Sequence, residues 1–448
     1  MNLERVQRGL VAAVAATCLV SIFAAEIFLA VACVVYLARL FRGTARLERL
    51  PLDGPLLAFT VWSILSAAFA PDPLAAHRSV KQLVLFSLLY LAVDTLRDED
   101  VRERVVDVAL LGGLVLGGGA IQQYLFLGFD TIQHRPRSFL GHYMTASGLV
   151  MGVLVLAAAR LAFRRGPVPR PSPRDLRGLA LVAVGLVLLT LLQRADLFAV
   201  EAERLFVAAL SAAAAAMVLS RSPWPDRGTG TLLALLAVPV CTVALLLSLT
   251  RNAWLGTLAG LVTLAFLRAP KALWLLPVGA AALLVLGPAR ILDRLTVTDA
   301  SSRDRYYMWQ AGIDMIRDKP VFGQGPRMIQ VVYPAYRWAE APNPVTPHLH
   351  NNALQIAAER GLPCLVWWLW LVAAVLGDSW REARRGKFAA GWVAPAAFAL
   401  VVAVLVAGLF EYNFGDSEIL MFLLLVSSLP YALRRQRDAA VDAAAARA

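Results

Sequence analysis

Apolar runs of about 20 residues recur from one end of this chain to the other, separated by short polar links. A helix of that length can cross a hydrocarbon core about 30 Å thick, because its backbone polar groups are satisfied within the helix. The windows lie near residues 9–24, 26–41, 53–70, 79–96, 105–127, 141–163, 178–192, 204–220, 231–249, 252–267, 272–289, 352–376, 389–410 and 417–433. Some are short or closely paired, so we expect an all-α, polytopic transmembrane bundle of about 12 spans, or 14 if every window crosses.

The composition favours the same fold class. The 448 residues are 59% hydrophobic and 17% charged, whereas a soluble domain has about 25% charged residues. The net charge of +12 could suggest a nucleic-acid partner, but the basic residues are spread over several loops and form no single patch. We therefore expect membrane lipids and no nucleic acid as partners. The first apolar run follows Arg5 and Arg8, and we expect it to remain as an uncleaved helix.

Arginine clusters predict the orientation, since cytoplasmic loops of membrane proteins are enriched in basic residues. The arginine-rich stretches are residues 39–49, 164–177, 221–227, 381–387 and 434–437, which we place in the cytoplasm together with both termini. Residues 71–78, 128–140, 193–203, 250–251, 290–350 and 411–416 then face outward. The predicted division is an N-terminal bundle (1–289), an outward loop (290–350), C-terminal helices (351–434) and a cytoplasmic tail (435–448).

The outward segment 290–350 is too polar to span a membrane but has the pattern of a folded segment. Ser301 or Ser302 could cap a helix that begins near Arg303 and ends at Pro320. Apolar residues recur at helical spacing within it: Tyr307, Met308, Ala311, Met315 and Ile316. A turn at residues 323–326 and a second amphipathic piece to about Trp338 follow. These helices could lie flat on the lipid surface or form a roof over a cavity between the spans.

His350 stands where this loop returns to the membrane, and we place it in the first turn of the following helix. The positive end of the helix dipole disfavours imidazolium, so the ring could accept a proton from a hydroxyl. The alternative is an interfacial histidine that only caps the helix. His348, two residues earlier, would have a supporting role.

Arg251 lies between two apolar windows, where an arginine is costly unless it reaches the interface or meets an anion. Its planar fork suits a phosphate or pyrophosphate, and snorkelling to the interface is the alternative. Arg194 and Arg204 flank another outward turn and could join it. For both, a structural salt bridge with a nearby carboxylate is the rival explanation.

Other outward residues could complete a polar site. Arg137 and His142 precede a helix start, and Glu411 and Asp416 bracket the last outward turn, where they could orient a sugar hydroxyl or a histidine. The four cysteines lie in apolar windows without metal-ligand spacing, and there is no Gly-rich phosphate loop and no outward DxD pair. We therefore expect no metal and no cofactor, and a lipid-linked rather than a nucleotide-linked donor.

Three stretches resemble the bacterial O-antigen ligases and their wider superfamily of O-antigen polymerases and protein O-oligosaccharyltransferases. The run from Thr250 to Gly256 is similar to the family's Arg-x-x-x-Leu signature, and His350-Asn351 followed after nine residues by Gly361 resembles its histidine motif. The family usually has Gly, Thr or Tyr where this chain has Cys364. The third stretch runs from Arg303 to Tyr333 and includes Tyr307, Trp309, Ile316, Asp318, Pro320, Phe322, Gly323 and Gly325. Together they cover roughly residues 248–370.

The resemblance implies a metal-independent, inverting glycosyltransferase in the inner membrane of a Gram-negative bacterium, with its site facing the periplasm. It would transfer O-antigen from undecaprenyl pyrophosphate to lipid A-core. His350 would be the general base, and Arg251, with Arg194 or Arg204, would bind the leaving pyrophosphate.

Two alternatives stay open at this point. A polymerase or a protein O-oligosaccharyltransferase would use the same donor with a different acceptor. A transporter is the hypothesis from another class, because polar residues in a helical bundle can line a path. The sequence has no internal repeat and no paired broken spans, which many transporters have.

Overall fold

The computed structural model describes residues 2–164, 227–275, 300–385 and 391–445, and these form helices joined by loops with no strand among them. Seven of the described helices are long and apolar enough to span a membrane. They are Ile22–Phe41, Pro73–Leu96, Glu99–Phe126, Tyr143–Ala162, Thr229–Leu247, Asn352–Arg385 and Ser417–Asp442. The chain is an all-α polytopic membrane protein, as predicted.

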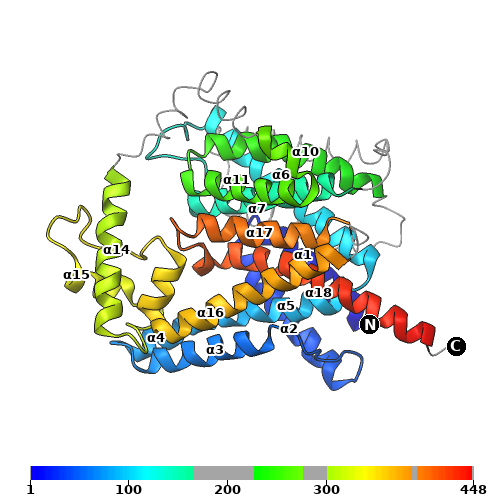
Figure 1. Cartoon of the computed structure of the whole chain (residues 1–448), viewed down its shortest axis with the longest axis horizontal. Helices are drawn as coiled ribbons and strands as arrows, with labels where there is room; N and C mark the ends of the chain where they lie inside the picture. The colour runs from blue at the N-terminus through cyan, green and yellow to red at the C-terminus, as the bar shows by residue number, and fades with distance from the viewer. Residues whose placement is uncertain (1, 165–226, 276–299, 386–390, 446–448) are drawn as a thin grey trace, which may run out of the picture.

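The centre of the bundle is formed by α6 (Glu99–Phe126), α7 (Tyr143–Ala162), α10 (Arg227–Leu247), α11 (Arg251–Arg268), α17 (Val393–Ala407) and α18 (Ser417–Ala445). Figure 1 shows α10, α6, α11 and α7 in the upper part and α17 below them. Small residues allow this close packing: a Cβ on Gly113 of α6 would overlap Val153 of α7, and one on Gly256 would overlap Met151. Small residues at such contacts are typical of membrane bundles.

Three N-terminal helices lie around this centre: α1 (Leu3–Thr17), α2 (Ile22–Phe41) and α3 (Asp53–Ala68). The turn between α1 and α2 lies at residues 18–21, so Glu26 lies within α2 and not between the first two windows. One side of α2 is apolar and exposed, with Phe23, Ile27, Val31, Val34, Leu37 and Phe41. Lipid is the solvent that such a face requires.

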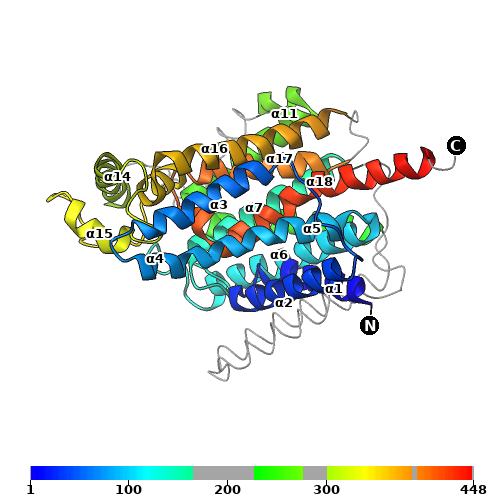
Figure 2. The ribbon, with the colours of Figure 1, turned by 90° about the horizontal axis from the view of Figure 1, so that it is seen from below.

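The predicted window at 79–96 is interrupted in the structure. Helix α4 (Pro73–Val80) leads into the 3₁₀ segment η1 (Lys81–Phe86), which continues as α5 (Ser87–Leu96). A 3₁₀ stretch inside a longer helix turns its side chains differently from an α-helix and often occurs at functional positions. Figure 2 shows α4 and α5 as one rod beside α3 and α6.

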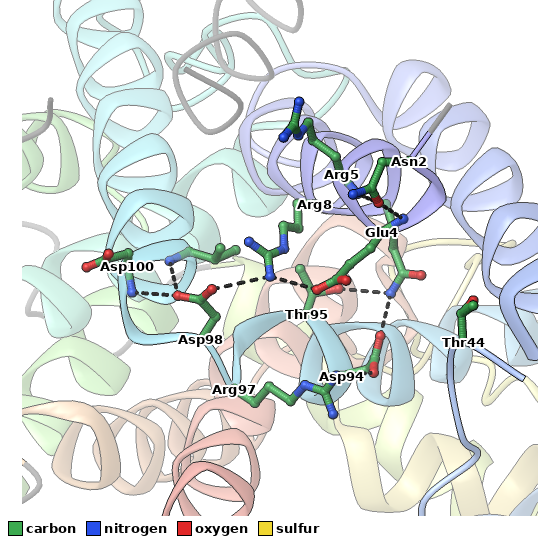
Figure 3. A network of polar contacts seen from close by, with 12 residues as sticks. Asn2, Glu4, Arg5, Arg8, Thr44, Asp94, Thr95, Arg97, Asp98 and Asp100 are labelled. Carbon is green, nitrogen blue, oxygen red and sulfur yellow. Dashed lines mark hydrogen bonds and ion pairs between the residues drawn. The ribbon is translucent and has the colours of Figure 1, made fainter. Parts of the chain in front are cut away.

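Two of the buried arginines that join helices near the end of the bundle with both termini are Arg39 and Arg160. Arg39 of α2 pairs with Asp94 of α5 at 2.6 Å and donates to Gln7 of α1. Figure 3 shows how Arg8 of α1 extends this network by lying between Glu4 and Asp98. Buried charges are tolerated in membrane helices when they are paired in this way.

The second buried arginine, Arg160 of α7, contacts two carboxylates of α6. Its Nη1 lies 2.5 Å from Asp107 and its Nη2 lies 2.6 Å from Glu103. A Cβ on Gly230 of α10 would overlap both Arg160 and Asp107, so only glycine lets α10 pack over this pair.

The loops predicted to face one way gather at one end of the bundle. The described parts of the outward set lie at the end marked by α4, α14 (Ala300–Asp318) and α15 (Ile329–Tyr336) in Figure 1, opposite the two termini. At the terminal end, Arg435 pairs with Glu48 and Arg437 with Glu382. The loops predicted to face outward and the arginine-rich loops therefore lie at opposite ends of the bundle, as the arginine distribution predicts. Which end faces the periplasm stays a prediction.

The two loop helices match the amphipathic pieces predicted from the sequence. Helix α14 begins at Ala300, so Ser301 and Ser302 lie in its first turn and do not precede it. Its predicted apolar face is buried at Met308, Ala311 and Met315, which pack with Tyr333 of α15 and Leu349. This face therefore packs on the protein and not on lipid, and the roof over a cavity between the spans stays a prediction.

Helix α16 (Asn352–Arg385) changes direction at Gly361, whose φ of 81° lies in the left-handed region. The loop at residues 320–325 docks against this break through backbone bonds: Leu362 N–H donates to Pro320 at 2.8 Å, and Gln324 N–H donates to Ala358 at 2.8 Å. Any Cβ on Gly361 would overlap the Val321 carbonyl. This glycine therefore fixes the outward loop to α16.

Some predictions fall partly outside the described residues. The windows 178–192 and 204–220, and most of 272–289, lie there, so the count of 12 to 14 spans stays a prediction. Helix α18 continues to Ala445, which is 11 residues beyond the predicted end of the C-terminal helices at 434. Alanine-rich sequence explains the extension, because alanine has the highest helix propensity.

Replacing Gly361 with alanine should lower the free energy of unfolding by about 2–4 kcal/mol, because the Cβ both overlaps backbone and strains a positive φ. The measurement is thermal unfolding of purified protein in detergent. Gly377→Ala on the same helix is the control, since only the end of the Arg381 side chain lies near that site. Equal midpoints for the two variants would contradict this role of Gly361.

Candidate functional site

His350 lies in a backbone segment that neighbouring side chains hold from both sides. The carbonyl of Leu349 accepts a bond of 3.0 Å from the Trp309 indole of α14, and the Leu349 N–H donates to Gln355 of α16 at 2.7 Å. His350 itself has a φ of 51°, which is uncommon for a residue with a side chain. Such strain persists where surrounding contacts determine the conformation, and it is concentrated at functional sites.

The His350 ring contacts the carboxylate of Glu411, in the loop between α17 and α18. Its Nδ1 lies 2.9 Å from Glu411 Oε2, and His348 Nδ1 lies 3.5 Å from Oε1 of the same group. Glu411 is buried, with its carboxylate also accepting the Tyr412 N–H at 3.0 Å. A carboxylate on Nδ1 fixes the imidazole tautomer and leaves Nε2 as the proton acceptor.

The charges of these groups are compatible with that arrangement. Burial alone would raise the pKa of Glu411, but the hydrogen bond from His350, with a further one from the Tyr412 N–H, holds that pKa well below its usual range. Burial lowers the pKa of His348 to about 4, against the attraction of Glu411. At neutral pH the site therefore has an ionised Glu411 beside an uncharged His348.

Two asparagines attach the His350 segment to the Glu411 loop. The Asn352 amide donates to Asn413 at 2.6 Å, and its oxygen accepts the Phe414 N–H at 3.0 Å. The Asn351 amide donates to the Leu409 carbonyl at 3.0 Å, while its oxygen caps α16 at Leu354 N–H. His350 therefore precedes the cap residue of α16 and does not lie in the first helical turn, as we had expected.

The same cluster has the composition of a metal site. Ligand atoms of His348, His350 and Glu411 all lie within 4.8 Å of one another. Two imidazoles and one carboxylate are a ligand set that zinc or another transition metal accepts. The hydrogen-bonded pair explains the same geometry without an ion, so the absence of a metal stays a prediction to be tested with a chelator.

Arg251 is the first residue of α11 and points toward the outward loop, where its Nη2 lies 3.3 Å from the Ser302 hydroxyl of α14. The turn before it is held by polar contacts: Ser147 of α7 donates to Thr250 at 3.1 Å, and Arg135 reaches the Leu249 carbonyl at 3.5 Å. Arg251 is thus placed at the same end of the bundle as His350, where an anion would be accessible.

The segment 135–145 approaches the histidine pair. His142 caps α7, and burial lowers its pKa, with Glu411 and His350 close enough to act on its charge. Arg137 bonds only to the Gly141 carbonyl through its side chain, and its backbone N–H binds Gln123. Asp416 accepts a bond of 2.9 Å from Thr145 of α7, so it does not contact His350.

Of the two carboxylates that the sequence offered to orient a histidine, Glu411 and not Asp416 contacts His350. The sequence interpretation missed one further buried carboxylate. Glu359 is buried and accepts bonds from Gln355, Arg360 and the Arg327 N–H. Two adjacent charges inside the apolar window 352–376 were the signal for it. Arg194 and Arg204 lie outside the described residues.

A family model described as O-antigen ligase matches residues 232–369. The match contains Arg251, the two loop helices and His350, whereas Glu411 and Asp416 lie beyond it. No curated protein matches the chain. The family match confirms the resemblance that the sequence predicted over roughly residues 248–370. It supports the conclusion that the chain is a member of the O-antigen ligase/polymerase superfamily.

Proposed function

We propose that this protein is an O-antigen ligase that transfers O-antigen polysaccharide from undecaprenyl pyrophosphate to lipid A-core. The observation that carries the proposal is the contact between His350 and the buried Glu411, because the family match includes this histidine and a carboxylate on Nδ1 suits an imidazole to act as a general base. The site would face the periplasm from a Gram-negative inner membrane.

In the proposed reaction, His350 Nε2 accepts the proton of the acceptor hydroxyl while that oxygen attacks the anomeric carbon of the donor sugar. The bond from this carbon to the pyrophosphate oxygen breaks, and attack from the opposite side inverts the centre. Glu411 stabilises the imidazolium that forms. Arg251 stabilises the charge that develops on the leaving undecaprenyl pyrophosphate, and the resemblance assigns Arg194 or Arg204 to the same group.

The test is glycan transfer by purified protein in nanodiscs, with undecaprenyl-pyrophosphate glycan, lipid A-core and EDTA. His350→Ala should lower the rate by about 10²–10⁴-fold and Arg251→Ala by about 10²–10³-fold, from the lost base and the lost charge stabilisation. His77→Ala and Arg317→Ala, on exposed surfaces, are the matched controls. Activity that disappears with EDTA and returns with a divalent ion would overturn the metal-independent mechanism.

The same assay separates the alternatives by acceptor. Longer chains formed from lipid-linked glycan alone would identify a polymerase, and transfer to a protein hydroxyl would identify an oligosaccharyltransferase. No glycan chemistry with any acceptor would overturn the proposal and favour transport.

Glu411→Gln should lower the maximal rate by about 10²-fold or more, because the amide no longer fixes the imidazole tautomer. The ionised carboxylate also stabilises the imidazolium that forms when the base accepts the proton, and this stabilisation is lost as well. Steady-state transfer rates at saturating substrate measure the effect. Glu340→Gln, on an exposed loop, is the control. A Glu411→Gln rate equal to that of Glu340→Gln would contradict this role of Glu411.

A further inference from the structure

A cavity of about 420 Å³ opens beside the candidate site, between α2, η1, the outward loop and the start of α18. This volume lies within the range of about 300–1,000 Å³ that small-molecule sites have. None of the residues assigned to catalysis lines it.

The walls of the cavity differ in character. Ile22, Leu29 and Ala30 of α2 form a mainly apolar side with Val84 and Leu85 of η1, and Glu26 of α2 is the carboxylate on this side. The exposed apolar face of α2 continues from this side toward the lipid. A ligand with an acyl chain could therefore enter along α2 without leaving the membrane.

The rest of the lining is polar and contains two cations. Lys81 and Arg327 line it with Gln82, Asp416 and Glu418. Among the described residues, no carboxylate lies within ion-pair distance of Lys81 or Arg327. Lysine and arginine side chains without a carboxylate partner suit phosphate groups, and the carboxylates of Glu26, Asp416 and Glu418 suit sugar hydroxyls.

Arg327 is held in place at some energetic cost. Its φ of 59° is in the left-handed region, and its N–H donates to the buried Glu359 at 2.9 Å. Glycine would adopt this backbone without strain. A long cationic side chain at such a position suggests that the charge itself is required at the cavity.

The cavity is connected to the proposed base by a short piece of chain. Gln82 of η1 donates to the Gly415 carbonyl at 2.5 Å, and Glu411, which binds His350, is five residues before Asp416. Five residues span at most about 18 Å, so a headgroup in the cavity lies within reach of His350 for an oligosaccharide.

Helix α11, which begins at Arg251, lies on the other side of the bundle from α2. Figures 1 and 2 both show α11 and α2 on opposite sides, with α7, α17 and α18 between them. If the donor pyrophosphate is bound at Arg251, as the proposed function assumes, the cavity is left for the second substrate.

We propose that this cavity binds the acceptor glycolipid, with the sugar phosphates of its headgroup at Lys81 and Arg327 and its acyl chains along α2. The inference rests on the proposed function for the identity of the acceptor. It assigns the acceptor and the donor to separate sides of the His350–Glu411 pair.

The experiment measures binding without catalysis. Full-length protein in phosphatidylcholine nanodiscs is titrated with fluorescent lipid A-core, with the same lipid after chemical dephosphorylation, and with undecaprenyl phosphate. The intact acceptor should bind about tenfold more tightly than the dephosphorylated one. Lys81→Ala/Arg327→Ala should remove this difference, and Ala30→Trp, which fills the cavity, should weaken both acceptor forms. Neither variant should alter binding of undecaprenyl phosphate.

Arg78→Ala is the matched control, because Arg78 is an exposed cation on α4 that does not line the cavity. Equal acceptor binding by wild type and both cavity variants would overturn the inference, as would weaker binding of undecaprenyl phosphate instead of the acceptor. An effect of Arg78→Ala as large as that of the double variant would show general surface attraction and would also overturn it. Phosphate-dependent acceptor binding by a wild type that transfers no glycan would support the cavity while the proposed function failed.

Discussion

The hydrogen bonds of Asn352 hold the candidate site together. His350 and Glu411 are 61 residues apart in the sequence and come from different loops. The Asn352 side chain uses its amide and its oxygen on the second loop, at Asn413 and Phe414, while its own N–H binds the Gly408 carbonyl. Because buried polar groups are costly when unpaired, these bonds favour one relative position of the loops. The carboxylate and the imidazole meet as a consequence.

A second constraint comes from the outward loop. Trp309 on α14 binds the backbone one residue before His350, and α14 is itself held by the docking of residues 320–325 on the bend of α16. Trp62 and Ser66 of α3 donate to carbonyls on both sides of this junction, at Arg360 and Phe322. The loop is thus part of the rigid frame of the site. Preorganisation of this kind is what a general base requires, since its geometry must be set before the substrate arrives.

The fold class was predictable because lipid imposes a simple pattern, in which each span is a run of apolar residues. Most helix positions followed from it, and Met308, Ala311 and Met315 revealed the buried face of α14 by their spacing alone. Local pattern could not show the pairing of His350 with Glu411, since it depends on how two distant loops meet. Nor could it show the 3₁₀ segment at Lys81–Phe86, because hydropathy does not distinguish an α-helix from a 3₁₀-helix.

The ion pair between α6 and α7 has a consequence for how the protein is made. Membrane helices enter the bilayer in the order of synthesis, and Arg160 arrives after Asp107 and Glu103, the carboxylates that neutralise it. An α6–α7 hairpin could therefore leave the translocation channel with the charge of Arg160 already paired, which avoids the cost of inserting that charge alone. Helix α10 is synthesised later, and it can pack against this ion pair because Gly230 has no side chain. The buried arginine thus sets an order of assembly.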